Sequence, residues 1–182
     1  MDLETLQYPI GRFSWNVESS PELREERLQI IEDTPAELRR VLAGLDEDQL
    51  NTPYRPDGWT VRQVVHHYAD DHMNSYIRFK LALTEDAPTI KAYSEPLWGE
   101  LPDARTGPIE PSLTLLTGLH QRWAAAWKAL APSDWMRTFI HPRSGKAISL
   151  DGLAALYAWH GRHHVAQVRA LRTRNGWTVP AA

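Results

Sequence analysis

Cysteine is absent from the 182-residue chain, which excludes disulfide bonds, a cysteine nucleophile and any metal site with thiolate ligands. A metal ion would need histidine, aspartate or glutamate instead. Nowhere do about 18 uncharged apolar residues follow one another, as a membrane helix requires. The first ten residues include Asp2 and Glu4 and no apolar run, unlike a secretory leader. We therefore expect a cytoplasmic protein with no membrane segment.

An excess of positive charge is also missing. The chain has 20 Lys and Arg against 23 Asp and Glu, a net charge of −3, so it has no general attraction for a polyanion and we expect no nucleic-acid binding. The sequence also lacks three common motifs: a glycine-rich phosphate loop, the nucleophile elbow of serine hydrolases and the dinucleotide-binding fingerprint. The length predicts a single domain over residues 1–182. What the composition does contain is 8 histidines and 8 tryptophans.

Four amphipathic stretches predict helices at 21–45, 60–83, 112–130 and 149–174. Ser20 and Pro21 are typical of a helix start, and Thr60 with Gln63 forms a capping-box pattern. Pro35 lies inside the first stretch, where a missing N–H and a steric clash predict a kink or a split. Four such helices in one domain favour an all-α four-helix bundle.

The connections between these stretches differ in character. Residues 85–111 carry five prolines and two glycines, which predicts a long crossover loop without regular elements. A loop of this length indicates that the helices it joins are not simple antiparallel neighbours, or that it covers something. Residues 3–20 are expected to form an ordered arm or loop, and residues 138–141 and 146–149 a small hairpin.

Two histidines on the last predicted helix suggest a metal site. His160 and His164 continue its apolar stripe, and their spacing puts two rings on one face with Cβ atoms about 5–6 Å apart, as two ligands of one ion require. Zinc proteases with this spacing carry a glutamate directly after the first histidine. Gly161 stands there instead, which excludes that class.

A third ligand should come from residues 60–83, where both His67 and His72 can face inward. The residues alone leave this choice open. The residues alone are equally consistent with inward histidines that form hydrogen bonds in the core and bind no metal. We expect His120 and His141 to be structural or exposed, and His66 and His163 to support a metal ligand or lie at the surface. The residues expected to orient a ligand or water beside the metal are Asp71, Asn74, His163 and Gln167.

Several blocks of the chain resemble the DinB/YfiT-like superfamily, and the resemblance spans roughly Tyr8 to Trp177. They are Tyr8 to Gly11, Thr52 to Arg55, Gly58 to His67, His72 to Lys80, Leu119 to Trp123 and Tyr157 to His164. The resemblance implies a four-helix bundle with one divalent metal ion per chain, zinc or nickel, bound by three histidines. It places the ligands on His67, His160 and His164, and so selects His67 over His72.

Three neutral imidazoles leave a divalent ion charged and with an open fourth position, which is typical of a catalytic site. The resemblance implies an S-transferase that moves a low-molecular-weight thiol of the bacillithiol type to an electrophile through a metal-bound thiolate. The alternative is a metal-dependent hydrolase that uses metal-bound water, and a second alternative is a non-enzymatic metal-binding stress protein. The expected partners are therefore a small-molecule thiol and an electrophilic substrate.

No general base is assigned. We expect a homodimer with the arm Tyr8 to Trp15 as a contact.

Overall fold

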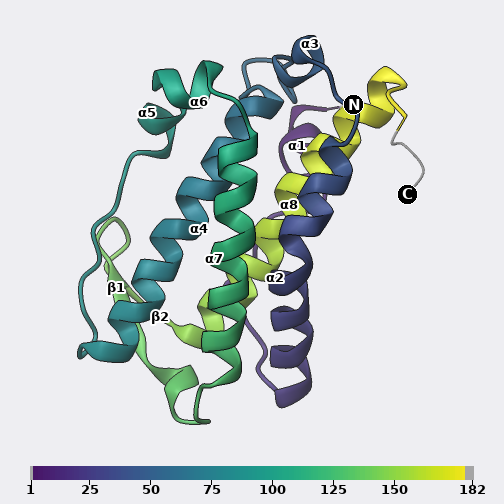
Figure 1. Cartoon of the computed structure of the whole chain (residues 1–182). Helices are drawn as coiled ribbons and strands as arrows, with labels where there is room; N and C mark the ends of the chain where they lie inside the picture. Colours follow the sequence, from purple (N-terminus) through teal and green to yellow (C-terminus); the bar gives the residue numbers. More distant parts are fainter. Residues whose placement is uncertain (1, 179–182) are drawn as a thin grey trace.

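Four long helices form the body of the molecule in a computed structural model that describes residues 2–178 (Figure 1). They are α2 (Pro21–Leu42), α4 (Val61–Thr84), α7 (Glu110–Lys128) and α8 (Leu150–Asn175). Helix α2 packs against α7 and α8, and α4 packs against the same two helices. This arrangement places α2 opposite α4 and α7 opposite α8, and the predicted four-helix bundle is confirmed.

Two pairs of neighbouring helices run parallel. In Figure 1, α4 and α7 both run downward from the end of the bundle that carries α3 (Glu47–Leu50), whereas α2 and α8 run upward. The chain must therefore return along the whole bundle between α4 and α7. The expectation that the long loop does not join simple antiparallel neighbours is correct.

The predicted helix starts and ends are found where side chains satisfy the free backbone groups. The hydroxyl of Ser20 accepts from the Leu23 amide at the start of α2, and Thr60 and Gln63 form the capping box of α4. Helix α8 ends at Gly176, whose φ of 67° is the left-handed conformation that favours glycine.

Pro35 does not split α2, which continues as one helix from Pro21 to Leu42. Proline has no N–H, so the carbonyl of Ile31, four residues earlier, lacks its usual helical donor. Nδ1 of His120 lies 2.6 Å from this carbonyl oxygen and takes the place of the missing donor. Of the expected kink or split, the split is wrong because α2 is continuous and a side chain from α7 satisfies the freed carbonyl; the kink stays a prediction.

The long connection is less irregular than expected. It contains two short helices, α5 (Glu95–Gly99) and α6 (Pro102–Thr106), and in each of them a proline occupies the first turn. Pro111 likewise lies in the first turn of α7. Proline is tolerated there because the first amides of a helix have no partner within it. Three of the five prolines that predicted the absence of helix therefore mark where helices begin.

The N-terminal arm begins with a helical turn that the sequence analysis missed, α1 (Leu3–Gln7), which is capped by Asp2. Further along, the indole nitrogen of Trp159 donates to the carbonyl of Gly11 at 3.2 Å, and the ring of Phe13 lies against Trp159. The arm thus packs on α8 of its own chain. Its expected role in a homodimer stays a prediction.

The predicted hairpin is present as β1 (Thr138–His141) and β2 (Lys146–Ser149), paired antiparallel after a 3-10 turn, η1 (Asp134–Met136). The long connection joins its outer edge, because the amide of Ile90 donates to the carbonyl of Ile140 and the amide of Ile140 donates to the carbonyl of Pro88. The hairpin and the connection therefore form one wall beside α4 (Figure 1).

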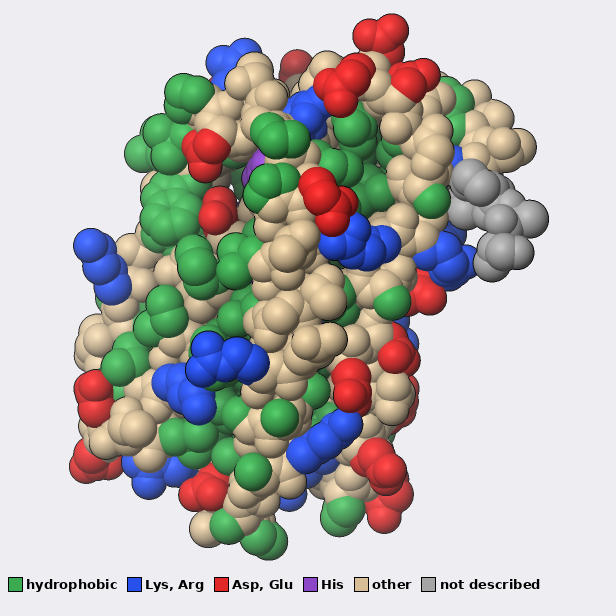
Figure 2. Space-filling view, in the orientation of Figure 1, with side chains coloured by type: hydrophobic (Ala, Val, Ile, Leu, Met, Phe, Trp, Pro, Cys, Tyr) green, Lys and Arg blue, Asp and Glu red, His purple; other side chains and the backbone are tan. Residues whose placement is uncertain are grey.

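The interior is rich in aromatic and histidine side chains. Trp123, Trp127 and Phe79 are fully buried in one apolar cluster, and five of the histidines are buried (His66, His72, His120, His163 and His164). The face of the molecule in Figure 2 accordingly shows almost no histidine surface. None of the helices in residues 2–178 combines the length and the apolar character needed to cross a membrane.

Candidate metal centre

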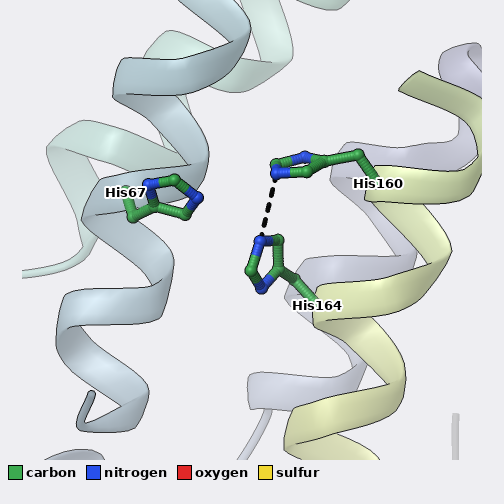
Figure 3. A group of neighbouring side chains, drawn as sticks. All are labelled: His67, His160 and His164. Atoms are coloured by element: carbon green, nitrogen blue, oxygen red, sulfur yellow. Dashed lines mark hydrogen bonds between the residues drawn. The ribbon is translucent and has the colours of Figure 1, made fainter. Parts of the chain in front are cut away.

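The structure brings His67, His160 and His164 together between α4 and α8. Each offers a ring nitrogen, and these three nitrogens all lie within 4.8 Å of one another. In Figure 3 the rings of His160 and His164 project from successive turns of α8 toward His67 on α4. The Nε2 atoms of His160 and His164 are 3.1 Å apart. The fold thus assembles the three residues that the resemblance proposed as ligands.

His72 lies on the other side of His160. Its Nε2 is 3.0 Å from Nδ1 of His160, the ring atom opposite to the one that approaches His164. With His160 and Asp71, His72 also belongs to a second group of potential ligand atoms within 4.8 Å of one another. The ring is completely buried and stacks on Tyr68. Its position behind His160 makes it a partner of that ring.

Hydrogen bonds orient the ring of His164. Its Nδ1 lies 2.8 Å from Oε1 of Gln167, and Nε2 of Gln167 donates to the carbonyl of Gln7 at 2.9 Å. Because a carbonyl only accepts, the amide of Gln167 is oriented with its oxygen toward His164. Nδ1 of His164 therefore carries the hydrogen, and its Nε2 has a free lone pair directed at His160.

Burial keeps these imidazoles neutral. It lowers the pKa of His67, and it lowers the pKa values of His160 and His164 well below the ordinary value, with further lowering from the neighbouring rings. Only a neutral imidazole has a lone pair to give to a metal ion. His164 is buried, and His67 and His160 are half-buried. Three neutral nitrogen donors in such a cluster fit a divalent cation such as zinc, which prefers this ligand type.

Asp71 brings a carboxylate to the cluster. Its Oδ2 lies 3.5 Å from Nε2 of His160 and accepts a hydrogen bond from the hydroxyl of Tyr157 at 2.8 Å. Oδ1 accepts one from Tyr93 at 3.1 Å. Burial and the nearby Asp71 charge raise the pKa of both tyrosines, so both remain hydrogen-bond donors. Together they hold the carboxylate beside the three histidines.

Tyr93 is one of the residues of this site that the sequence analysis missed. It lies in the long connection between α4 and α5, where no periodic pattern indicates which side chains point inward. The long connection therefore covers part of the site, the second of the two roles that its length suggested.

A cavity of about 710 Å³ opens onto His67, His160 and Asp71. One part of its wall is apolar, with Phe139, Leu153 and Leu156 among its residues. Another part carries the cationic side chains of Arg78, Arg143 and Lys146. Arg143 pairs with Glu95 at 3.1 Å, whereas Arg78 and Lys146 have no carboxylate partner within residues 2–178.

The other predicted site residues take different positions. Gln167 contacts His164 directly. Nε2 of His163 lies 3.0 Å from Nε2 of Gln167. Asn74 is not part of the site, because its side chain donates to the Asp70 carbonyl on its own helix and does not line the cavity.

Three further histidines were expected outside the ligand set, His120 and His141 as structural or exposed residues and His66 as a support for a ligand or a surface residue. His66 is buried and bonds to Ser112 and Gly107, so the expectation for His66 is wrong and its role is structural. His120 is buried beside His72. His141 lines the cavity, a position that nothing in its sequence neighbourhood indicated.

Comparisons with known proteins agree with this geometry. Residues 30–168 match the model of the DinB superfamily. A Bacillus mycoides protein named "Putative metal-dependent hydrolase" is 51% identical over 175 residues, which cover 96% of this chain and 100% of that protein. A Bacillus cereus protein of the same name is 50% identical over the same shares.

A solved structure shows the same fold. YfiT from Bacillus subtilis, described as a probable metal-dependent hydrolase with an unusual four-helix bundle topology, has a TM-score of 0.93 and 45% identity to this chain. The match covers 96% of this chain and 99% of that one. The similarity extends over nearly the full length, and the family model matches as well. Together they establish family membership. The chain belongs to the DinB superfamily.

Proposed function

We propose that this protein is a metal-dependent hydrolase whose metal ion is held by His67, His160 and His164. The observation that carries the proposal is the cluster of three neutral ring nitrogens within 4.8 Å of one another, open to a cavity beside a carboxylate. The similar proteins named above support hydrolysis, the alternative in the sequence analysis, more than the thiol transfer that the family resemblance put first.

When bound by three imidazoles, a divalent cation such as zinc or nickel supplies a Lewis acid that makes water nucleophilic near neutral pH. The three histidines supply no negative charge, so the charge of the ion is not neutralised by its protein ligands. Burial lowers the pKa values of these histidines, so each ring is neutral at neutral pH and keeps one nitrogen lone pair for the ion.

Asp71 is the proposed proton acceptor. Its Oδ2 lies 3.5 Å from Nε2 of His160, and the carboxylate lines the cavity. The hydroxyls of Tyr93 and Tyr157 donate one hydrogen bond to each carboxylate oxygen, which holds the group in place. A positioned general base of this kind contributes about 10²- to 10⁴-fold in rate.

The lining of the cavity suggests a substrate with an apolar body and an anionic group. Phe139 and Leu156 offer apolar surface, whereas Arg78 and Lys146 offer positive charge. Nε of Arg78 is buried without a hydrogen-bond partner and the side chain lines the cavity, so a bound carboxylate or phosphate would supply the missing acceptor. An ester or amide with such a group would place its reactive carbonyl near the histidines.

The first experiment measures the metal content of untagged protein purified without added metal, in wild type and in the His67→Ala and His164→Ala variants. We expect about one zinc or nickel ion per wild-type chain and a loss of metal in both variants. His66→Ala is the matched control, since this histidine is buried on α4 and bonds outside the cluster. Wild-type protein that binds neither metal after reconstitution at neutral pH would contradict the proposal.

The second experiment separates hydrolysis from thiol transfer. Metal-loaded protein is given 4-acetoxybenzoate in water alone, and separately 1-chloro-2,4-dinitrobenzene with and without added cysteine. Turnover of the ester without thiol is the result expected of a hydrolase. Turnover only when cysteine is present would favour the S-transferase and overturn hydrolysis. A protein that binds metal and turns over neither substrate agrees with the non-enzymatic alternative.

A further inference from the structure

A continuous line of hydrogen bonds runs from α2 through the core to the candidate metal centre. Nδ1 of His120 lies 2.6 Å from the carbonyl oxygen of Ile31, and Nδ1 of His72 lies 2.8 Å from Nε2 of His120. Nε2 of His72 is then 3.0 Å from Nδ1 of His160. His72 and His120 are 0% and 1% exposed, so water does not compete for these bonds. We call His120, His72 and His160 the histidine chain.

The carbonyl of Ile31 determines the direction of every bond in the histidine chain. A carbonyl oxygen only accepts, so Nδ1 of His120 must donate. A neutral imidazole has one N–H, which leaves a lone pair on Nε2 of His120 to accept from Nδ1 of His72. By the same argument Nε2 of His72 accepts from Nδ1 of His160. The hydrogen of His160 is thereby on Nδ1, and Nε2 has a free lone pair.

Pro35 is the reason that the Ile31 carbonyl is free. In an uninterrupted helix the amide of residue 35 would donate to the carbonyl of residue 31. Proline lacks that hydrogen, and a proline inside a helix costs about 3 kcal/mol. The bond from His120 offsets part of this cost. The proline inside α2 frees a carbonyl, and the buried histidine on α7 donates to it.

We propose that His120 and His72 are positioning residues that, anchored on Ile31, keep Nε2 of His160 free of hydrogen for metal binding. His164 is prepared in the same way by Gln167, and the two Nε2 atoms then face each other at 3.1 Å. Two lone pairs at this distance repel, and a cation between them removes the repulsion. The inference rests on the proposed function only in assuming that the centre holds a metal ion.

The first test determines the positions of the ring hydrogens in metal-free protein. Nitrogen-15 NMR of the histidine side chains reports which nitrogen carries the hydrogen. We expect His120, His72 and His160 all to carry it on Nδ1. A hydrogen on Nε2 of His160 in wild-type protein would overturn the inference. The measurement needs no metal and no substrate, so its outcome is independent of whether the protein is a hydrolase.

The second test interrupts the histidine chain. His120→Phe keeps a ring of similar size and removes the acceptor for His72. We expect His72 and His160 to shift toward the form with hydrogen on Nε2, and zinc affinity, measured by competition with a chelator, to fall about 10- to 100-fold, as for other residues that support metal ligands. His120→Gln places an amide oxygen near the position of Nε2 and should restore most of the affinity.

The control is His66→Phe, which removes a buried histidine of α4 that bonds to Ser112 and Gly107 outside the histidine chain. It should leave zinc affinity unchanged. A folded His120→Phe protein with wild-type affinity and an unchanged His160 ring would refute the proposal.

Pro35→Ala provides a second route if His120→Phe does not fold. It returns an amide that competes with His120 for the Ile31 carbonyl, so zinc affinity should fall while α2 gains stability. A purely structural role of Pro35 predicts no fall in affinity, and unchanged affinity with unchanged ring hydrogens would again refute the proposal.

Discussion

Gln167 accepts the Nδ1 hydrogen of His164 through its Oε1 at 2.8 Å. Its amide nitrogen donates at the same time to the carbonyl of Gln7 at 2.9 Å, at the end of α1. The orientation of a proposed metal ligand on α8 therefore depends on an N-terminal helical turn whose last residue, Gln7, lies 160 residues before Gln167.

Replacing Gln167 tests this dependence. Gln167→Leu keeps most of the volume but removes the acceptor, so we expect metal affinity to fall about 10- to 100-fold. Gln167→Glu keeps an oxygen acceptor for His164 and should retain affinity, although it loses the bond to Gln7. Chelator competition on folded protein measures both values. Equal losses in the two variants would show that the bond to Gln7 matters more than the acceptor.

Asp71→Asn tests the proposed general base. The amide is nearly the same size but is a poor proton acceptor, so we expect kcat for ester hydrolysis to fall about 10²- to 10⁴-fold with the metal content unchanged. Asp70→Asn is the matched control, since Asp70 is the adjacent carboxylate and does not line the cavity. Unchanged kcat in Asp71→Asn would remove Asp71 from the mechanism.

Arg78→Met tests the proposed anionic group of the substrate. Loss of this cavity cation should lower kcat/KM for the anionic ester 4-acetoxybenzoate about tenfold or more, because a charge-assisted hydrogen bond contributes about 1.5–3 kcal/mol. The neutral methyl ester should be affected little. Lys80→Met removes an exposed cation from the same helix and should not change the preference. Equal effects on the two esters would argue against an anion-binding role.

His120 makes the stability of the metal-free protein depend on pH. Burial lowers the pKa of His120 to about 4, against an ordinary value of about 6.5 in the unfolded chain. Between these values the unfolded state binds the proton and the folded state does not, so stability is highest above pH 6.5 and falls as the pH decreases. Between pH 7.5 and 4.5 this group should lower the free energy of unfolding by about 2–3 kcal/mol.

Urea unfolding of wild type and His120→Gln at the two pH values isolates this contribution. The difference between the two pH values should be smaller in the variant by about the same 2–3 kcal/mol. An equal difference in both proteins would mean that other groups cause the pH dependence.

Gly161→Ala tests a close approach between helices. A Cβ at this position would lie 2.6 Å from Oγ1 of Thr34 and 2.9 Å from the hydroxyl of Tyr68, so we expect a destabilisation of about 1–3 kcal/mol. Gly118→Ala is the control, because a Cβ there meets nothing within 4 Å, and the helix should gain about 0.5–1 kcal/mol. Thermal or urea unfolding compares the two, and stabilisation by Gly161→Ala would contradict the predicted clash.

The sequence by itself determined the four long helices and the histidine pair of the site on α8. Capping residues such as Thr60 and the apolar periodicity are local signals, so the ends of α4 and α8 could be predicted closely. The spacing of His160 and His164 on one helix is local in the same sense. The prolines of residues 85–111 predicted an absence of helix that the structure does not show, because the effect of a proline depends on whether it lies in the first turn of a helix or inside it.

Only the tertiary structure decided which distant side chains meet. His67 and His72 both face inward on α4, and their separate roles follow from how α8 packs against that helix. Tyr93 reaches Asp71 from an irregular connection, where no periodicity predicts its direction. The bond between His120 and Ile31 joins a proline effect on α2 to a side chain on α7. Contacts of this kind depend on packing between elements, and no spacing along a single helix contains them.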